Sequence, residues 1–495
     1  MTLDLSVWID TRGFSSADAR AALRSVLAQS GEVSAIICLG EAATLAEFSA
    51  DIPAGRAVEL IVLERSEDAA VRLNELIGGT SAPWLVWLAA SAVLREGAFA
   101  TLDAALGEFD LDLVYADGVL PDGTPVRRPT FSPVRLREQD YLGDLRAMRV
   151  DAIRSVGGFR TGLGSAHPLD LALRIGTDAA RVLRIPEPLT TSLRARIAGS
   201  ESSRLAVTGR LDELGVAARV SVVPDAPLEV QYAIDGEPLV SIIVPTRGSS
   251  AVVHGSERTF VVDALRGIVE RSTYRALEFI VVTDDDVTER TVDELRDVAG
   301  DRLRLVRWSA PFNFSAKMNL GAVHASGDYL VLLNDDVDVI TPDWIEAMLG
   351  LAQQHGIGLV GALLLFEDGT VQHGGHLYAD SWAGHIAIHW DQRRDDPLGS
   401  MRVVREVSGV TAACAMVSSD TFWKVGGLST DYSGNYNDVD FSLKIRAAGR
   451  SILWTPHARL FHFESKSRIA TVRPEELETL RVHWGTMLLS DPYWR

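Results

Sequence analysis

The clearest hydrophobic pattern in the chain is a short apolar run that ends abruptly in acidic residues. Residues 328–338 read DYLVLLNDDVD, and such an apolar run is typical of a strand buried on both faces of a sheet. Because ionised side chains are unstable inside such a strand, Asp335, Asp336 and Asp338 are expected where it leaves the sheet. Open α/β sheets bind ligands at the carboxyl ends of their strands. The pattern therefore predicts a ligand site here.

Paired carboxylates at a strand end favour a hard divalent cation. Mg²⁺ and Mn²⁺ are commonly held by one or two carboxylates together with the oxygens of a substrate diphosphate. An acidic surface turn accounts for three aspartates equally well. The rest of the chain has to decide between these two interpretations.

Strand and helix patterns alternate in the same order twice along the chain. In the second half, the strand PLVSIIVP is followed by a helix, the strand LEFIVV, a second helix and the strand LVLLN. The first half repeats this order, and residues 84–94 overlay residues 329–339 at a constant offset of 245. Alternation of this kind predicts, for each half, a mainly parallel, doubly wound α/β sheet flanked by helices.

The first copy lacks the acidic residues of the second. The offset places small uncharged residues opposite the acidic strand end: Ala89, Ala90 and Ser91 opposite Asn334, Asp335 and Asp336. A second match, which needs one gap, places Pro168 opposite Asp438. We therefore expect a degenerate domain without metal or base residues at 1–200, a connector at 201–237, a complete domain at 238–470 and a helical tail at 471–495.

Length, charge and cysteine content exclude several classes of protein. A chain of 495 residues exceeds what one hydrophobic core usually supports, and its formal net charge of −19 argues against binding nucleic acid. Cys38 and Cys414 show neither disulfide nor metal-ligand spacing, which favours a reducing compartment. The sequence shows no signal peptide, and no apolar stretch reaches the ~20 residues of a spanning helix. We expect a cytoplasmic protein; peripheral association with the inner face of the membrane and homo-oligomerisation are both compatible with the sequence.

Further polar residues follow the acidic strand. Asp438 and Asp440 come just before a helical pattern, and they share a face if the chain there is extended. His462 and the cations Lys466 and Arg468 follow a later apolar strand. These residues are candidates for binding a cation and a phosphate group.

A polar loop at 368–401 carries four histidines: His373, His376, His385 and His389. Their irregular spacing on a loop disfavours zinc, so contact with an acceptor substrate or plain surface polarity is the better interpretation. His373 and Asp440 are the acceptor candidates. Gly409 lies in a strand of small residues, VSGVTAACAMV, that a ligand can approach closely.

The second half, from about Pro238 onward, resembles the inverting family 2 glycosyltransferases with a GT-A fold, especially the bacterial branch that builds rhamnose-containing or O-antigen polysaccharides. The resemblance rests on several segments in the same order: SIIVPTRG, EFIVVTDD, FNFSAKMNLGA, YLVLLNDDVDV, DGTVQHGG, SGVTAACAMV, KVGGL, YNDVDFSLKIR, FHFESKSR and DPYWR. It covers about half of the chain, and the first half resembles the same fold without its motifs.

The resemblance implies roles for individual residues. The nucleotide pocket of the family maps to Pro245, Thr246, Arg247 and Asp284. Its DXD motif maps to Asn334, Asp335 and Asp336, so Asp336 is expected to be the main ligand of Mn²⁺ or Mg²⁺, with His462 as a further ligand. The general base maps to Asp438, although Asn437 stands where the family usually has Glu.

Glycosyl transfer from a nucleoside diphosphate explains why these groups are needed. Breaking the anomeric bond leaves negative charge on the diphosphate, which a divalent ion and the cations Lys317, Lys466 and Arg468 can stabilise. The expected donor is dTDP-rhamnose or a UDP-sugar, and the expected acceptor is a polysaccharide or a lipid-linked glycan. Two alternatives stay open: a non-catalytic glycan-binding scaffold, and a sugar nucleotidyltransferase.

Overall fold

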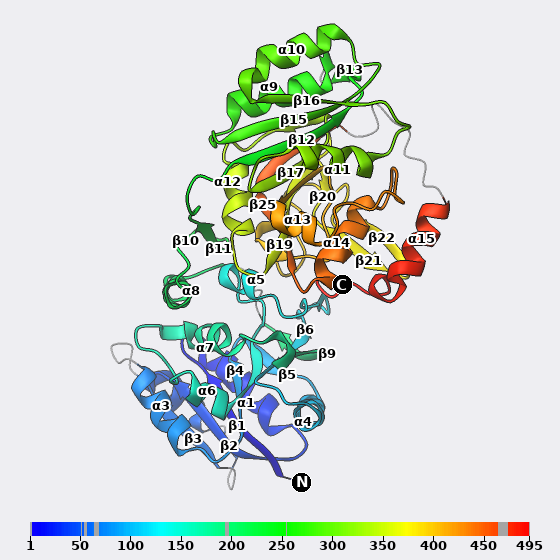
Figure 1. The fold of residues 1–495 in the computed structure, drawn as a ribbon. Helices are drawn as coiled ribbons and strands as arrows, with labels where there is room; N and C mark the ends of the chain where they lie inside the picture. The colour runs from blue at the N-terminus through cyan, green and yellow to red at the C-terminus, as the bar shows by residue number, and fades with distance from the viewer. Residues whose placement is uncertain are drawn as a thin grey trace. The chain divides into compact units, whose positions relative to one another are not determined.

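The computed structural model describes residues 2–50, 52–53, 57–63, 69–193, 198–253, 255–463 and 474–494, which form two compact units (Figure 1). The first unit comprises residues 1–230, 396–400 and 495, and the second comprises residues 231–395 and 401–494. Each unit contains one large mixed α/β sheet flanked by helices. Among the described helices, none combines the length and the apolar character needed to cross a membrane.

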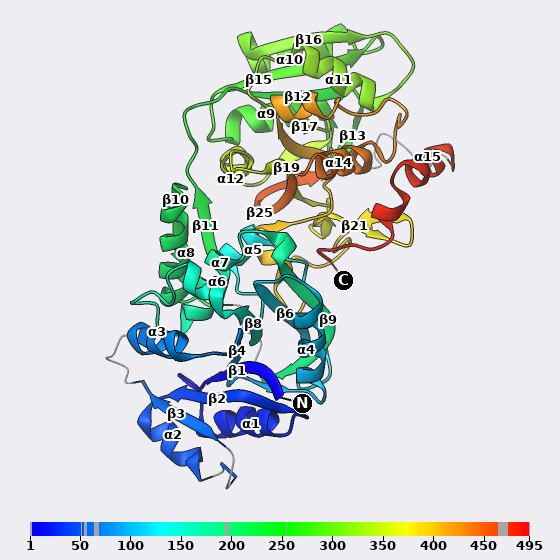
Figure 2. The same cartoon turned by 60° about the horizontal axis from the view of Figure 1, so that its bottom comes forward.

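The first unit is built on a sheet of nine strands. Across the sheet the strands follow the order β3 (Val58–Val62), β2 (Glu32–Gly40), β1 (Thr2–Asp10), β4 (Trp84–Ala89), β8 (Leu145–Arg149), β6 (Leu113–Val119), β9 (Val182–Ser192) and β5 (Ala92–Leu94), with β7 (Pro125–Val126) paired to β6. The strands β3, β2, β1 and β4 are parallel, and Figure 2 shows the first three side by side. The strand β8 runs antiparallel to both of its neighbours.

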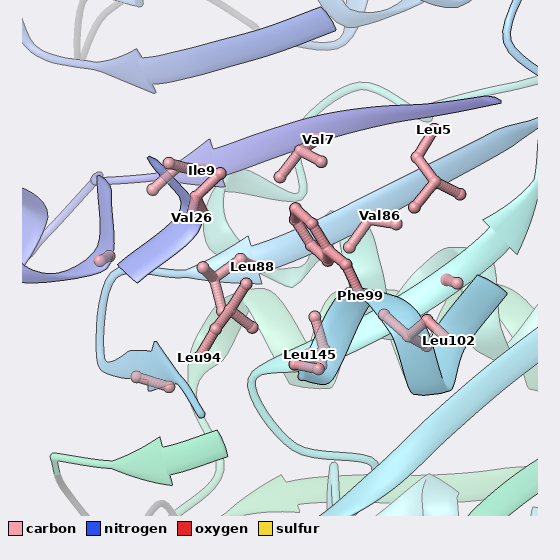
Figure 3. Packing of buried hydrophobic residues seen from close by; sticks show 14 of the residues in the cluster. Leu5, Val7, Ile9, Val26, Val86, Leu88, Leu94, Phe99, Leu102 and Leu145 are labelled. Carbon is pink, nitrogen blue, oxygen red and sulfur yellow. The ribbon is translucent and has the colours of Figure 1, made fainter. Parts of the chain in front are cut away.

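Helices cover both faces of this first sheet. They are α1 (Ser16–Leu27), α2 (Ala42–Ser49), α3 (Ala69–Gly79), α4 (Ala98–Glu108), α5 (Pro133–Glu138), α6 (Val150–Ser155), α7 (His167–Ile175) and, after the sheet, α8 (Glu201–Glu213). Because side chains alternate along a strand, Leu5, Val7 and Ile9 of β1 lie on one face and pack in one cluster with residues of α1 and α4 (Figure 3). Trp8 points to the other face, where it stacks on Phe159 with ring centroids 5.9 Å apart.

The second unit repeats this arrangement with a sheet of ten strands. Its order is β16 (Leu303–Trp308), β15 (Leu277–Asp284), β12 (Val240–Thr246), β17 (Tyr329–Leu333), β24 (Cys414–Ser418), β19 (Ile357–Leu365), β25 (Ser451–His462) and β18 (Val337–Val339), with β20 (Val371–His373) on β19 and β23 (Arg405–Glu406) on β25. The strands β16, β15, β12 and β17 are parallel, and β24 runs antiparallel to β17 and β19.

The helices of the second unit are α9 (Phe260–Arg271), α10 (Glu289–Ala299), α11 (Phe314–His324), α12 (Trp344–Ala352), α13 (Ser419–Lys424), α14 (Asn437–Ala447) and α15 (Pro474–Trp484). Three small hairpins complete the chain: β10 (Ala218–Val222) with β11 (Leu228–Tyr232), β13 (Ser250–Val253) with β14 (Ser256–Thr259), and β21 (His376–Ala379) with β22 (Trp382–His385). Side chains of α11, α13 and α14 share one hydrophobic cluster with one face of the large sheet.

The main paths of the two sheets have the same strand order, and only β23 of the second sheet has no counterpart among the described strands of the first. β4 and β17 are the fourth strands of their sheets, and β5 and β18 are the last, as the offset of 245 residues requires. The fold class predicted from the sequence, two tandem α/β domains with mainly parallel sheets flanked by helices, is confirmed. Each sheet is nevertheless mixed. The strand β8 or β24 in its middle is antiparallel to both neighbours, and so are the outer pairs β5–β9 and β6–β7 in the first sheet and β18–β25, β19–β20 and β23–β25 in the second.

Candidate active site

A cavity of about 730 Å³ lies in the second unit, where β12, β15 and β17 end. Parallel strands bring their carboxyl ends to one edge of a sheet, so polar residues that follow different strands converge there. Ten of the residues predicted from the sequence line this cavity: Pro245, Thr246, Arg247, Asp284, Lys317, Asn334, Asp335, Asp336, Asp438 and His462. Gly409, His373 and Asp440 do not line it, and Lys466 and Arg468 fall outside the described residues.

Lys317 and Asp284 form a buried ion pair in the cavity wall. Asp284 ends β15, and Lys317 lies in α11, where its neighbours Met318 and Ala322 belong to the core. The Lys317 ammonium lies 2.8 Å from Oδ1 of Asp284 and donates to the backbone oxygen of Thr246 over 3.2 Å. Lys317 is only 2% exposed. Removing Asp284 would therefore leave a buried charge unpaired, which is strongly destabilising.

Asp335 is held by a short chain of hydrogen bonds. The Thr246 hydroxyl donates to Oδ2 of Asp335 over 2.6 Å and accepts from the backbone N–H of Gly248 over 2.9 Å. Burial, and next the negative charge of Asp336, raise the pKa of Asp335 to about 7. Two adjacent acids resist joint ionisation when no cation balances their charge. At neutral pH Asp335 is therefore partly protonated.

Strand pairing brings His462 beside Asp336. Val337 of β18 pairs with His462 of β25, and the backbone N–H of residue 463 donates to the backbone oxygen of Asp336. His462 Nε2 then lies 3.1 Å from Oδ1 of Asp336 and 3.0 Å from the side-chain nitrogen of Asn334. His462 Nδ1 lies 2.6 Å from Oε1 of Gln372, an atom that can only accept. The Nδ1 atom therefore carries a proton, and the lone pair on Nε2 of the neutral ring faces Asp336.

These residues fit a divalent cation. Oδ1 of Asp336 is buried and accepts no hydrogen bond from the described part of the chain. Although burial opposes ionisation, the positive charge of a protonated His462 lowers the pKa of Asp336. When the ring is neutral, two electron-pair donors face each other, an arrangement that a cation between them stabilises. Gln372 supplies the outer hydrogen bond that metal-binding histidines usually make.

Asp438 reaches the same cavity from the first turn of α14. Its side chain is 20% exposed, and its Oδ2 atom lies 3.7 Å from Nε2 of His376. A carboxylate at a helix N-terminus is stabilised by the helix dipole. Asp438 is therefore a partly solvated carboxylate on the cavity wall, which is the environment that a general base requires.

The expectation that Asp440 faces the acceptor is wrong. The chain is already helical from Asn437, and residues two apart in a helix differ by about 200° in direction, so Asp438 and Asp440 do not share a face. Asp440 is buried, accepts from the indole N–H of Trp484 over 2.9 Å and lies 3.5 Å from the Lys444 ammonium. Its contacts are those of a residue that fixes α14.

His373 and Gly409 also lie behind the cavity wall. His373 is fully buried; its Nε2 atom accepts the backbone N–H of Thr411 over 3.2 Å. A Cβ added at Gly409 would lie 2.4 Å from the hydroxyl of Tyr378 and 2.7 Å from Nδ1 of His376. Gly409 therefore lets the chain pass close to His376 instead of letting a ligand approach.

Several residues of the cavity were not predicted as site residues. They come from β20, the β21–β22 hairpin and the segment before α14: Gln372, His376, Trp382, His385, Tyr436 and Glu476, the last of which lies in α15. The available signal was weak: two four-residue segments, HLYA and WAGH, flank Asp380 and Ser381 and contain aromatic residues that are common in strands.

Among its described residues, the first unit has no equivalent set of groups at the corresponding strand ends. Its first strand ends in Asp-Thr-Arg-Gly at 10–13, where the second unit has Pro-Thr-Arg-Gly at 245–248. Arg12 is held by both oxygens of Asp10, over 2.8 and 2.9 Å. Ser91 donates to Asp144 over 2.6 Å, so the position opposite Asp336 is occupied by a hydroxyl in an internal hydrogen bond. The carboxylate lost from this copy has been replaced by structural contacts.

Residues 241–426 match the protein-family model described as Glycosyl transferase family 2. Except for residues 396–400, the matched stretch lies in the second unit. The match begins in β12 and includes the strand ends that supply Thr246, Asp284 and Asp336 to the cavity.

The similarity to two named relatives extends beyond the residues that match the family model. The chain is 31% identical over 413 residues to the uncharacterized protein y4gI of Sinorhizobium fredii, which covers 77% of this chain and 45% of that protein. It is 30% identical over 436 residues to the O-antigen biosynthesis protein RfbC of Myxococcus xanthus, which covers 84% of this chain and 34% of that protein. The chain thus spans less than half the length of both relatives.

Two solved structures of transferases are similar to about half of the chain. GalNAc-T7 with UDP, GalNAc and Mn²⁺ gives a TM-score of 0.41 at 13% identity, covering 52% of this chain and 49% of that one. The mannosyltransferase PcManGT of Pyrobaculum calidifontis with GDP-Man and Mn²⁺ gives a TM-score of 0.35 at 16% identity, covering 51% and 71%. At such scores the likeness supports no conclusion about substrates or metal here.

Proposed function

We propose that the second unit is a metal-dependent, inverting glycosyltransferase that moves a sugar from a nucleoside-diphosphate donor to a glycan. One observation carries this proposal: Asp336 and His462, which face each other, and the carboxylate of Asp438 line a single cavity in the unit that matches the family 2 glycosyl transferase model.

The donor nucleotide is assigned to the end of the cavity formed by β12 and β15. Pro245, Thr246 and Arg247 would contact it there, and Asp284 would accept a hydrogen bond from the base. Asp336 and His462 would hold Mn²⁺ or Mg²⁺, which when bound stabilises the negative charge that develops on the leaving diphosphate. The uncharged Asn334 at the first DXD position gives this site one acidic ligand fewer, which makes His462 more important.

Asp438 is the proposed general base. It would take the proton of the acceptor hydroxyl as that oxygen attacks the anomeric carbon, a contribution of roughly 10²- to 10⁴-fold in rate. A single displacement of this kind inverts the anomeric centre. Its partly solvated position leaves room for an incoming hydroxyl.

The substrates are proposed from the relatives and the family. The similarity to an O-antigen biosynthesis protein favours a polysaccharide or lipid-linked acceptor at the inner membrane face, with dTDP-rhamnose or a UDP-sugar as donor. The first unit, in which small uncharged residues stand at the end of β4, is proposed to be a degenerate domain that positions the acceptor or forms an oligomer contact.

Calorimetric binding of UDP and dTDP, with and without Mn²⁺, tests the proposal. We expect one nucleotide to bind in a Mn²⁺-dependent manner, Asp336→Ala to abolish that dependence, and a change at the exposed Asp301 to leave it intact. Release of a nucleoside diphosphate would support the transferase, whereas release of pyrophosphate would show a nucleotidyltransferase. Absence of nucleotide binding would contradict the proposal and favour a glycan-binding scaffold.

A further inference from the structure

Trp382 presents an unusual surface inside the cavity of the second unit. It lines the cavity and is 51% exposed, more than any other tryptophan in the described ranges. Its indole side chain makes no hydrogen bond, ring contact or cation–π contact with a described residue. A large apolar side chain left open in a cavity usually marks a binding surface.

The indole ring of Trp382 is supported from one side. Trp382 and Gly384 are two apart in β22, so both side-chain positions face the same way. A Cβ added at Gly384 would lie 1.9, 2.5 and 2.6 Å from three carbons of the indole. The ring therefore lies directly against the glycine backbone, while about half of the Trp382 surface stays exposed at the cavity. A supported aromatic face offers a flat partner for the C–H groups of a sugar ring.

His385, at the end of the same strand, adds a polar group of defined direction. The backbone N–H of Thr411 points at Nε2 of His373, so the proton of the neutral His373 ring is on Nδ1. That Nδ1 lies 3.0 Å from Nδ1 of His385 and donates to it. The His385 ring accepts at Nδ1 and must carry its own proton on Nε2. Burial, reinforced by the neighbouring histidines, lowers the pKa of His373 well below the ordinary value, consistent with neutral rings.

The same geometry argues against a metal ion among the histidines. Nitrogens of His373, His376 and His385 lie within 4.8 Å of one another, close enough for shared coordination. A ligating histidine carries its proton on the other ring nitrogen and donates it to an acceptor. With a metal on Nδ1, the proton on Nε2 of His373 would point at the N–H of Thr411, donor against donor. A hydrogen-bonded chain explains all of these contacts.

The surface formed by Trp382 and His385 lies on the side of the cavity that holds Asp438. His385 pairs with His376 across the β21–β22 hairpin, and His376 Nε2 lies 3.7 Å from Oδ2 of Asp438. The nucleotide end is made by other strands, β12 and β15. We propose that Trp382 and the Nε2–H group of His385 form the acceptor subsite, and that its occupant is a pyranose ring stacked on the indole with a hydroxyl directed toward Asp438. This inference rests on the transferase function proposed above.

Saturation-transfer NMR on the intact protein tests the subsite. The probes are methyl α-L-rhamnopyranoside, methyl α-D-mannopyranoside and methyl β-D-galactopyranoside, with glycerol as a polyol that has no ring face. We expect at least one glycoside to receive saturation on its ring C–H groups and glycerol to receive none. Trp382→Ala should weaken binding of that glycoside by roughly five- to tenfold, and Trp382→Phe by less, because a smaller aromatic face remains.

Trp423 provides the matched control. It is 47% exposed, lies in α13 and does not line the cavity, so Trp423→Ala should bind the glycoside as the parent protein does. His385→Leu, which keeps the volume but removes the N–H group, should also weaken binding, whereas His385→Gln should retain most of it.

Three results would overturn the subsite. The first is equal glycoside binding by Trp382→Ala and the parent protein. The second is nucleotide binding without binding of any glycoside, which would leave the transferase proposal standing; loss of both would remove the two together. The third is about one zinc ion per chain that survives chelation and disappears in His373→Ala, which would replace the hydrogen-bonded chain with a metal site.

Discussion

His462 Nε2 lies 3.1 Å from Oδ1 of Asp336, and Gln372 determines which way that imidazole presents its lone pair. The contact between Gln372 and Nδ1 of His462 is 2.6 Å long and buried. It joins β20 to β25, so the side chain that orients the histidine comes from the edge of the sheet and not from the acidic strand end. The proposed cation site therefore depends on residues from separate strands.

Gln372→Leu should weaken Mn²⁺ binding without removing a ligand. Loss of the outer hydrogen bond lets the His462 ring rotate and take the other tautomer, and such changes usually cost about 10- to 100-fold in metal affinity. The free Mn²⁺ signal in electron paramagnetic resonance measures this affinity directly. Gln354→Leu is the control, because Gln354 contacts the backbone of α12. Equal Mn²⁺ affinity in both variants would show that Gln372 does not orient the ligand.

Asp438→Asn should abolish most sugar transfer while keeping nucleotide binding. The amide cannot accept a proton from the acceptor, so we expect a 10²- to 10⁴-fold loss in turnover. The comparison with Asp440→Asn separates chemistry from folding, since Asp440 contacts Trp484 and Lys444 behind the wall. That second variant should lower the free energy of unfolding by about 1 kcal/mol and leave turnover within a fewfold. If Asp440→Asn lost turnover and Asp438→Asn kept it, Asp440 would be the general base instead.

Asp335→Asn should stabilise the metal-free protein at pH 8 but not at pH 4. The folded-state pKa of Asp335, about 7, lies above the ~3.9 of an unfolded aspartate. Stability from the protonated form is therefore fully present below about pH 4 and is lost as pH rises toward 7. Removing the charge should recover about 1–2 kcal/mol at pH 8, measured by urea unfolding. An exposed control, Asp301→Asn, should show no such pH dependence.

The fold was predictable because each strand pattern is local. The run before Asn334 is apolar on both faces, so it can only be an internal strand, and the same run recurs before Ala90. The direction of β24 could not be read in this way. Its residues, Cys414–Ser418, are as apolar as those of a parallel strand, and only its place between β17 and β19 makes it antiparallel.

The candidate site was predictable where it follows a strand end and not where it depends on a tight hairpin. Asp336 and Asp438 adjoin recognisable elements, and both line the cavity. Trp382 was missed because the hairpin that places it turns at Asp380 and Ser381, whose φ values of 49° and 65° are uncommon for residues other than glycine. A loop was therefore expected at 368–401, and the meeting of His373 with its neighbours could not be anticipated.

Gly409→Ala should destabilise the second unit. The added Cβ would lie 2.4 Å from the Tyr378 hydroxyl, 2.7 Å from Nδ1 of His376 and 2.8 Å from Cβ of Ser442, all three of them buried. Overpacking of this kind costs about 1–3 kcal/mol, measurable by urea unfolding. At Gly485 an added Cβ meets nothing within 4 Å, so Gly485→Ala should change stability by less than about 0.5 kcal/mol. If Gly409→Ala and Gly485→Ala have the same free energy of unfolding, the wall behind His376 is more adaptable than its packing indicates. His376 then need not hold a fixed place beside Asp438.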